Sequence, residues 1–249
     1  MISVPFMGSS RSARCCRSPH QPTTPMSRIV DATLVAAPKQ RNTEAERAAV
    51  KEGKTAAEIW PGDPAKARQK DTDARWTLKF AKGRPTADGQ GGFRPQPDTA
   101  IPSFGYNSSI SICRVFGFIR KGKVTDGARY DGRMLRDVVS EDNTASDVWA
   151  DTAHRSQSYE RWLKSHGRPS RIHRRKPKGR LMPANIRRGN ATRSKVRARV
   201  EHVFAHQKAK MDLFIRTIGI ACAEAKITLA NLAFNMHRLV FHETRKATG

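Results

Sequence analysis

The stretch Ala191-Thr-Arg-Ser-Lys-Val-Arg-Ala-Arg-Val-Glu-His-Val-Phe-Ala-His-Gln-Lys-Ala-Lys210 predicts one amphipathic helix with a single acid among basic residues. Apolar residues spaced three and four apart form a core-facing stripe on it, namely Val196, Val200, Val203 and Phe204. On a neighbouring face, Arg197, Glu201 and Lys208 lie within about 40° of one another. The helix therefore holds one carboxylate, that of Glu201, on a rigid and half-buried element.

Glu201 supports two interpretations. The first is a solvated salt bridge with Arg197 one turn earlier, which contributes roughly 0.2–0.5 kcal/mol. The second is a metal ligand in a site that handles phosphate groups. The helix by itself favours the salt bridge, so the other elements of the chain have to decide between the two.

The chain of 249 residues has a formal net charge of +25. Such an excess predicts salt-sensitive binding to a polyanion, with nucleic acid as the default partner, although a packaging protein would be equally basic. The four cysteines show no zinc-ligand spacing. No run approaches the length of about 18 apolar residues that predicts a membrane span. We therefore expect a nucleic-acid-binding protein of the cytoplasm, associated with the nucleoid.

Two expected strands carry isolated acids. Arg28–Ala37 is a β-branched and apolar run that contains one acid, Asp31. A carboxylate in a central strand is costly unless it is paired or binds a cation, so Asp31 is either at a strand edge or a metal ligand. The second strand, Ser146–Asp151, ends on an acid, Asp151, and ligands in sheet-based folds collect where strands end.

The other elements predict an α/β fold in which helices flank a mixed sheet. Residues 38–102 are polar and rich in Gly and Pro, and we interpret them as a long insertion after the first strand. A capping box at Thr43 and Glu46 predicts a short helix there. An antiparallel hairpin is expected next, followed by helices on either side of the second acidic strand. The expected hairpin strands are 103–113 and 116–125, and the further helices are 131–140, 156–166 and 224–241.

The segment Ser170–Arg180 combines one expected strand with a dense basic tail that contains no acid. Contacts with the phosphates of a nucleic-acid backbone explain this composition better than exposure of a charged loop to solvent does. We expect DNA to be contacted by Arg171, Arg174, Arg175, Lys176 and Lys178. Three isolated carboxylates on two strands and a helix, inside so basic a chain, are what two divalent cations need in order to bind a phosphodiester.

In combination, these motifs resemble the DDE transposases of bacterial insertion sequences, specifically the insertion sequence five group. The matching pieces are Ile29-Val-Asp-Ala-Thr33, Asp71-Thr-Asp-Ala-Arg-Trp76, Phe104-Gly-Tyr106, Asp147-Val-Trp-Ala-Asp-Thr-Ala153, Ser170-Arg-Ile-His-Arg-Arg175, Val196-Arg-Ala-Arg-Val-Glu-His-Val-Phe204 and Arg216-Thr-Ile-Gly219. The resemblance implies a ribonuclease-H-like catalytic domain over residues 28–243, with the insertion at about 38–102, an atypical lead-in at 1–27 and a tail at 244–249.

The resemblance also implies a catalytic and metal-binding triad, which falls on Asp31, Asp151 and Glu201. These carboxylates would hold two Mg²⁺ or Mn²⁺ ions. Related transposases carry a Tyr, Arg, Glu, Lys signature on the third-acid helix. Arg197, Glu201 and Lys208 match that signature while Ser194 replaces its tyrosine, and the two cations are expected to bind the DNA backbone.

The implied activity is metal-dependent cleavage at the ends of an insertion sequence, followed by strand transfer into target DNA. The implied partners are double-stranded DNA, as terminal inverted repeats and target, and a second copy in a homodimer, with no membrane partner. Only 30 residues precede Asp31, where relatives carry a helical region that recognises DNA ends. We therefore expect an N-terminally truncated copy, and the alternative is an inactive DNA-binding remnant.

Overall fold

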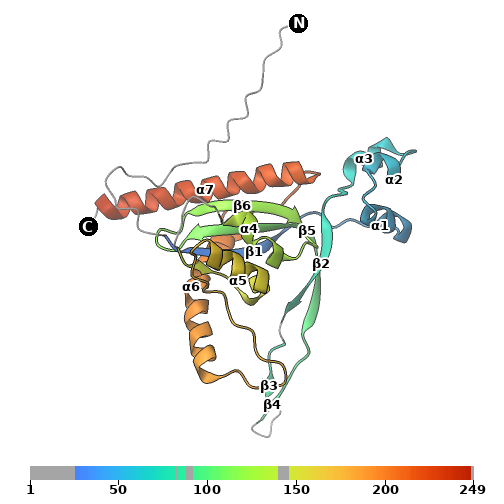
Figure 1. The fold of residues 1–249 in the computed structure, drawn as a ribbon. Helices are drawn as coiled ribbons and strands as arrows, with labels where there is room; N and C mark the ends of the chain where they lie inside the picture. The colour runs from blue at the N-terminus through green and yellow to red at the C-terminus, as the bar shows by residue number, and fades with distance from the viewer. Residues whose placement is uncertain (1–25, 82, 88–91, 140–145, 248–249) are drawn as a thin grey trace.

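The structure is a computed structural model that describes residues 26–81, 83–87, 92–139 and 146–247. The expected lead-in at 1–27 lies almost wholly outside these residues. A central sheet is flanked by helices (Figure 1). The elements are β1 (Arg28–Ala36), α1 (Glu44–Lys51), α2 (Ala56–Ile59), α3 (Pro64–Gln69), β2 (Arg75–Ala81), β3 (Thr86–Ala87), β4 (Phe93–Arg94), β5 (Thr99–Cys113), β6 (Ile119–Asp126), η1 (Asp131–Arg133), α4 (Leu135–Val138), β7 (Val148–Trp149), η2 (Thr152–His154), α5 (Gln157–Ser165), α6 (Ala184–Ala209) and α7 (Ile220–Ala247).

β1 lies inside a five-stranded mixed sheet. It pairs antiparallel with β5 on one side and parallel with β7 on the other. β5 also pairs antiparallel with β6, so the predicted hairpin is confirmed. Beyond β7, the strand expected at Ser170 reduces to a single parallel bridge with Val148. This mixed α/β architecture is consistent with a ribonuclease-H-like fold.

Successive side chains of β1 and β7 point to opposite faces of the sheet. Ile29 and Trp149 pack with α6 on one face, and α7 adds Phe234 to the same core. Val30 and Val148 point the other way and pack with α4 and α5. Because both faces are covered, successive residues of these strands are buried on opposite sides, which explains their continuous apolar runs.

The expected helix at 131–140 is wrong in part. The chain forms the short turn η1 and the four-residue helix α4 instead, and Ser140 lies outside the described residues. Gly132 near the start and the β-branched pair Val138 and Val139 near the end all disfavour a longer helix. By contrast, the capping box of α1 is present as predicted, with Thr43 and Glu46 exchanging hydrogen bonds.

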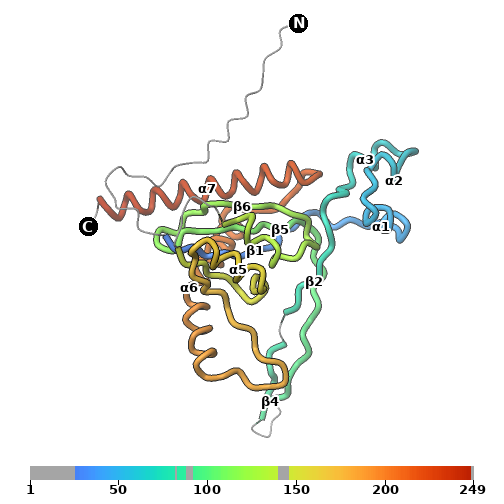
Figure 2. Tube along the Cα trace, viewed as in Figure 1, coloured from blue at the N-terminus to red at the C-terminus, as the bar shows by residue number. Residues whose placement is uncertain are grey.

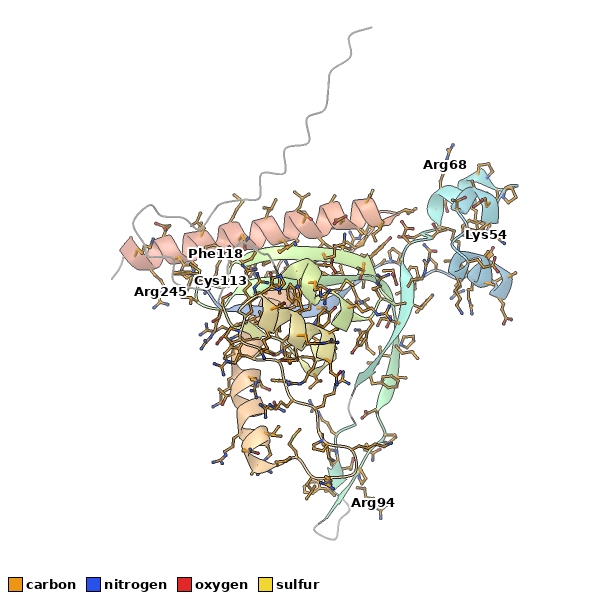
Figure 3. The ribbon with its side chains drawn as sticks, in the orientation of Figure 1. Lys54, Arg68, Arg94, Cys113, Phe118 and Arg245 are labelled. Carbon is orange, nitrogen blue, oxygen red and sulfur yellow. The ribbon has the colours of Figure 1, made fainter. Side chains whose placement is uncertain are left out.

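Residues 38–102 form a helical lobe beside the sheet and an arm that extends the sheet at its β2 edge. The helices α1, α2 and α3 make a small lobe, on which Lys54 and Arg68 lie (Figure 3). β2 and the first part of β5 make a two-stranded arm that leaves the body of the protein and ends at the β3–β4 pair near Arg94. Figure 2 shows the N-terminal end of α6 leaving the sheet in the same direction as this arm.

Candidate active site beside β1 and β7

The parallel pairing of β1 with β7 places two of the predicted acids at the same height along the strand direction. The register joins Arg28 to Val148 and Ile29 to Trp149, so its continuation by two residues sets Asp31 opposite Asp151. Both acids fall on the sheet face that α6 covers, because Ile29 and Trp149 point that way. Asp151 also begins the turn η2, where its carboxylate accepts a hydrogen bond from the Ala153 amide.

Two cations of α6 bind β1 at this point. Nη2 of Arg197 lies 2.6 Å from Oδ2 of Asp31, and both side chains are largely buried, at 14% and 17% exposed. Nζ of Lys208 donates to Oγ1 of Thr33 over 2.6 Å. Arg197 therefore pairs across the fold with Asp31, and the local salt bridge with Glu201 that the helix suggested is not formed.

Glu201 stands between these two cations on the same side of α6. Its side chain is exposed, and it has no hydrogen-bond or ion-pair partner among the described residues. No group of three or more His, Cys, Asp or Glu side chains in the described ranges is close enough to hold a metal ion. The structure therefore brings Asp31 and Asp151 onto neighbouring segments of the sheet and leaves the Glu201 carboxylate apart from them.

The chemistry of this donor set suits a hard divalent cation, because carboxylate oxygens are the ligands that Mg²⁺ and Mn²⁺ prefer. The Arg197 guanidinium already places one positive charge against Asp31. The Asp31 carboxylate of β1 therefore already lies against a cation in this structure.

Three further titratable side chains surround the two aspartates. Burial lowers the pKa of His154, which is only 1% exposed, and the carboxylates of Asp151 and Asp31 act against that shift. Burial raises the pKa of Asp131 and lowers that of His173. Within the described residues, Oδ1 of Asp131, Nδ1 of His154 and Nε2 of His173 are buried without a hydrogen-bond partner.

Sequence reasoning assigned none of these three side chains to the site. The position of His154, three residues after Asp151, was the one local signal available. Asp131 and His173 reach the site through tertiary packing, which no short motif encodes.

A basic hollow of about 760 Å³ lies beside Asp151, and its lining includes Arg155, Arg161, Arg174 and Arg175. The guanidinium of Arg175 donates to the carbonyl oxygen of Thr152, which adjoins Asp151 in the chain. Burial, and after it the neighbouring cations Arg174, Arg171 and Arg155, lowers the pKa of Arg193. These cations lie close enough together to repel one another, and a surface of this kind attracts a polyanion.

The basic tail is exposed from Arg174 to Arg180, whereas Ile172 before it is buried in the core. Arg171 forms an ion pair of 3.3 Å with Asp147. The side chains of Arg174, Lys176 and Lys178 have no ion-pair partner in the part of the chain that the structure describes. They therefore point into solvent next to the hollow and are available to phosphate groups.

Two carboxylates on neighbouring strands can bind a divalent cation, and the cation-rich hollow near them can bind phosphate groups, so the site suits chemistry on a nucleic-acid backbone. Residues 23–236 match the family model described as the transposase DDE domain, so the chain belongs to that family. Its members are nucleases and strand transferases that act in DNA transposition, and they generally use divalent metal ions. No curated protein matches the chain. No helix of the described residues is long and apolar enough to cross a membrane.

Proposed function

We propose that this chain is a DNA transposase of the insertion sequence five group, which cleaves phosphodiester bonds at element ends and transfers the freed strand to target DNA. The observation that carries the proposal is the register between β1 and β7, whose continuation by two residues sets Asp31 opposite Asp151. Asp31 lies within β1, and a residue on a strand is held more precisely next to a substrate than one on a loop.

Asp31, Asp151 and Glu201 would hold the divalent cations, two Mg²⁺ or Mn²⁺ ions. Such ions, when bound, polarise a phosphoryl oxygen and lower the pKa of a coordinated water. Arg197 neutralises Asp31 in the structure. Once a divalent cation lies there, Arg197 would be free to bind a DNA phosphate, and Lys208 would hold the backbone from the other side of Glu201.

Double-stranded DNA is the partner that the charge distribution supports. The hollow beside Asp151 and the basic tail would bind the phosphate backbone, which supplies affinity without reading sequence. We further propose that residues 28–243 are the catalytic domain and that residues 38–102 are an insertion in it. Direct pairing of β1 with β5 supports this, because the helices α1, α2 and α3 between these strands lie off the sheet and β2 joins it only at the edge, beside β5.

The test is a cleavage and strand-transfer assay on DNA that carries the element's terminal inverted repeats, with Mg²⁺, with Mn²⁺ and with a chelator. We expect Asp31→Asn, Asp151→Asn and Glu201→Gln each to lower the rate by about 100-fold or more. Asp212→Asn is the matched control, since the Asp212 side chain is 87% exposed and lies outside the site. Undiminished cleavage in the three variants would overturn the triad. DNA binding without cleavage under every condition would favour the inactive remnant.

A further inference from the structure

The helix α7 has two opposite apolar faces. Its inner face packs on the sheet through Ala223, Ile227 and Phe234. Asn235 extends this inner face by exchanging hydrogen bonds with the backbone of Ile119 in β6. The outer face points away from these contacts, and in Figure 1 no described element lies over it.

The outer face carries an apolar repeat. Its residues follow one another at alternating intervals of three and four positions, in the order Cys222, Ala225, Leu229, Leu232, Met236 and Leu239. This is the spacing of the seam along which two helices pair. The inner face already fills the role of a core stripe, so the second stripe is not needed to hold α7 on the sheet.

The side chains of this repeat are unusually exposed for their size. The exposed fractions are 65% for Leu229, 52% for Leu232, 69% for Met236 and 45% for Leu239, with 64% for the adjacent Val240. Between Cys222 and Leu239 no charged side chain falls on the repeat, in a chain whose formal net charge is +25. Contiguous apolar patches of a few hundred Å² on a protein surface usually mark an interaction site.

We propose that the outer face of α7 pairs with the same face of a second copy of this chain, with the two helices antiparallel. A second copy fits because the repeat is apolar and nearly free of charge, so two strongly basic molecules can meet there with the least repulsion. Pairing of two such stripes would bury on the order of 1,000 Å² in total, the size of the smaller specific interfaces.

The order of side chains along the repeat supports the antiparallel direction. Its small residues, Cys222 and Ala225, lie at the start and its large ones, Met236 and Leu239, at the end. Antiparallel pairing sets Cys222 against Leu239 of the second copy and Ala225 against Met236 of the second copy. Each layer then joins a small and a large side chain, or two leucines in the centre, which fills space evenly.

Charge at the end of α7 favours the same direction. Arg245 and Lys246 lie in its last turn. Parallel helices would bring these cations of the two copies side by side, whereas antiparallel helices separate them. Since the remaining repulsion between two basic molecules is screened by salt, association should strengthen as the salt concentration rises.

The first experiment measures the mass of the full chain by sedimentation, without DNA or metal, up to about 100 µM and at two salt concentrations. We expect a dimer with a dissociation constant in the micromolar range that tightens at higher salt. Leu232→Glu with Met236→Glu should weaken it by about 100-fold or more, because charges would be buried in the seam. His237→Glu is the matched control, because His237 is exposed on the same helix but off the repeat. Circular dichroism checks that all variants fold.

The second experiment tests the direction by oxidative crosslinking in a Cys15→Ser and Cys16→Ser background, in which Cys113 is buried and Cys222 is exposed. We expect Leu239→Cys to give a dimer crosslinked through Cys222. The two thiols of one copy are roughly 25 Å apart along the helix and cannot join within it.

A chain that stays monomeric at every concentration, or a Leu232→Glu and Met236→Glu variant that dimerises as well as the unchanged chain, would overturn the interface. Efficient crosslinking through Cys222 alone would overturn the antiparallel direction. Both experiments omit DNA and metal, so their results are independent of the proposed transposase activity.

Discussion

Nη2 of Arg197 on α6 lies 2.6 Å from Oδ2 of Asp31 on β1, although 166 positions separate the two residues in the chain. This pair ties the helix that carries Glu201 to the strand that carries the first acid. It also means that a signature cation of the helix neutralises a proposed metal ligand. The pair therefore couples the charge of the site to the packing of α6.

Replacement of Arg197 by Met removes the charge and keeps the apolar stem. We expect the free energy of unfolding to fall by about 1–3 kcal/mol, because Asp31 is left largely buried without its partner. Added Mn²⁺ should raise the melting temperature of Arg197→Met more than that of the unchanged chain, because the ion then replaces the lost charge. Chemical denaturation and thermal melts measure the two effects.

The control for this prediction is the double variant Asp31→Asn with Arg197→Met. If the pair is coupled, the double variant loses less stability than the two single variants together. Strict additivity of the two losses would contradict the interaction.

The exposed lysines of the basic tail give a prediction about salt. Lys176→Ala with Lys178→Ala should lower the slope of the logarithm of DNA affinity against the logarithm of salt concentration by about 1.8, since two phosphate contacts are lost. The loss should be the same on every DNA sequence, because such contacts read none. Filter binding or fluorescence anisotropy over a salt series measures it.

A matched pair lies on the small lobe, where Lys51→Ala with Lys54→Ala makes the same change in net charge away from the hollow (Figure 3). An equal loss of slope in both pairs would show that net charge, rather than the basic tail, governs binding.

His154 gives a prediction about pH. Burial lowers the pKa of His154 from its ordinary value of 6.5. As the pH falls, the imidazole is therefore protonated in the unfolded chain at a higher pH than in the folded chain. The stability that neutral His154 contributes is therefore complete above about pH 6.5 and is lost as the pH falls towards its folded pKa. His154→Gln should flatten the dependence of unfolding free energy on pH in this window. His202→Gln, at an exposed position of α6, should leave it unchanged.

Local patterns were enough to predict several elements. The β-branched run of β1, the short apolar run of β7 and the hairpin of β5 and β6 follow from alternation and turn residues, and the capping box at Thr43 locates α1. These signals depend on residues close together in the chain. The arm was missed although Trp76, Leu78 and Phe80 alternate with polar residues, because the region around them is rich in Gly and Pro.

The long-range features of the site were beyond such patterns. The start of α6 at Ala184 could not be inferred, because its first turns carry no apolar periodicity and face solvent. The i,i+4 spacing of Arg197 and Glu201 suggested a local pair, whereas the nearly buried carboxylate of Asp31 is the stronger attraction for a guanidinium. The approach of Asp131 to the two aspartates likewise depends on packing between segments that are distant in the chain.

Asp71 gives the last prediction, because it joins three segments of the fold. Asp71 is 5% exposed, and its carboxylate accepts a hydrogen bond of 2.6 Å from the hydroxyl of Tyr106 in β5. The carboxylate also accepts hydrogen bonds from the backbone amides of Asp73 and Ala74, which precede β2. A further hydrogen bond, of 3.4 Å, comes from the backbone amide of Gly219, which precedes α7. Burial, and after it the bond to Asp71, raises the pKa of Tyr106, so the hydroxyl stays a donor.

Asp71→Ala should therefore lower the free energy of unfolding by about 3 kcal/mol or more, because several buried donors lose their acceptor together. Tyr106→Phe should cost about 1 kcal/mol, since one bond is lost and the ring still packs. Asp63→Ala removes an exposed helix cap of α3 and should cost about 0.5–1 kcal/mol. Urea denaturation measures all three, and an Asp71→Ala loss no larger than that of Asp63→Ala would show that Asp71 does not join β2, β5 and α7.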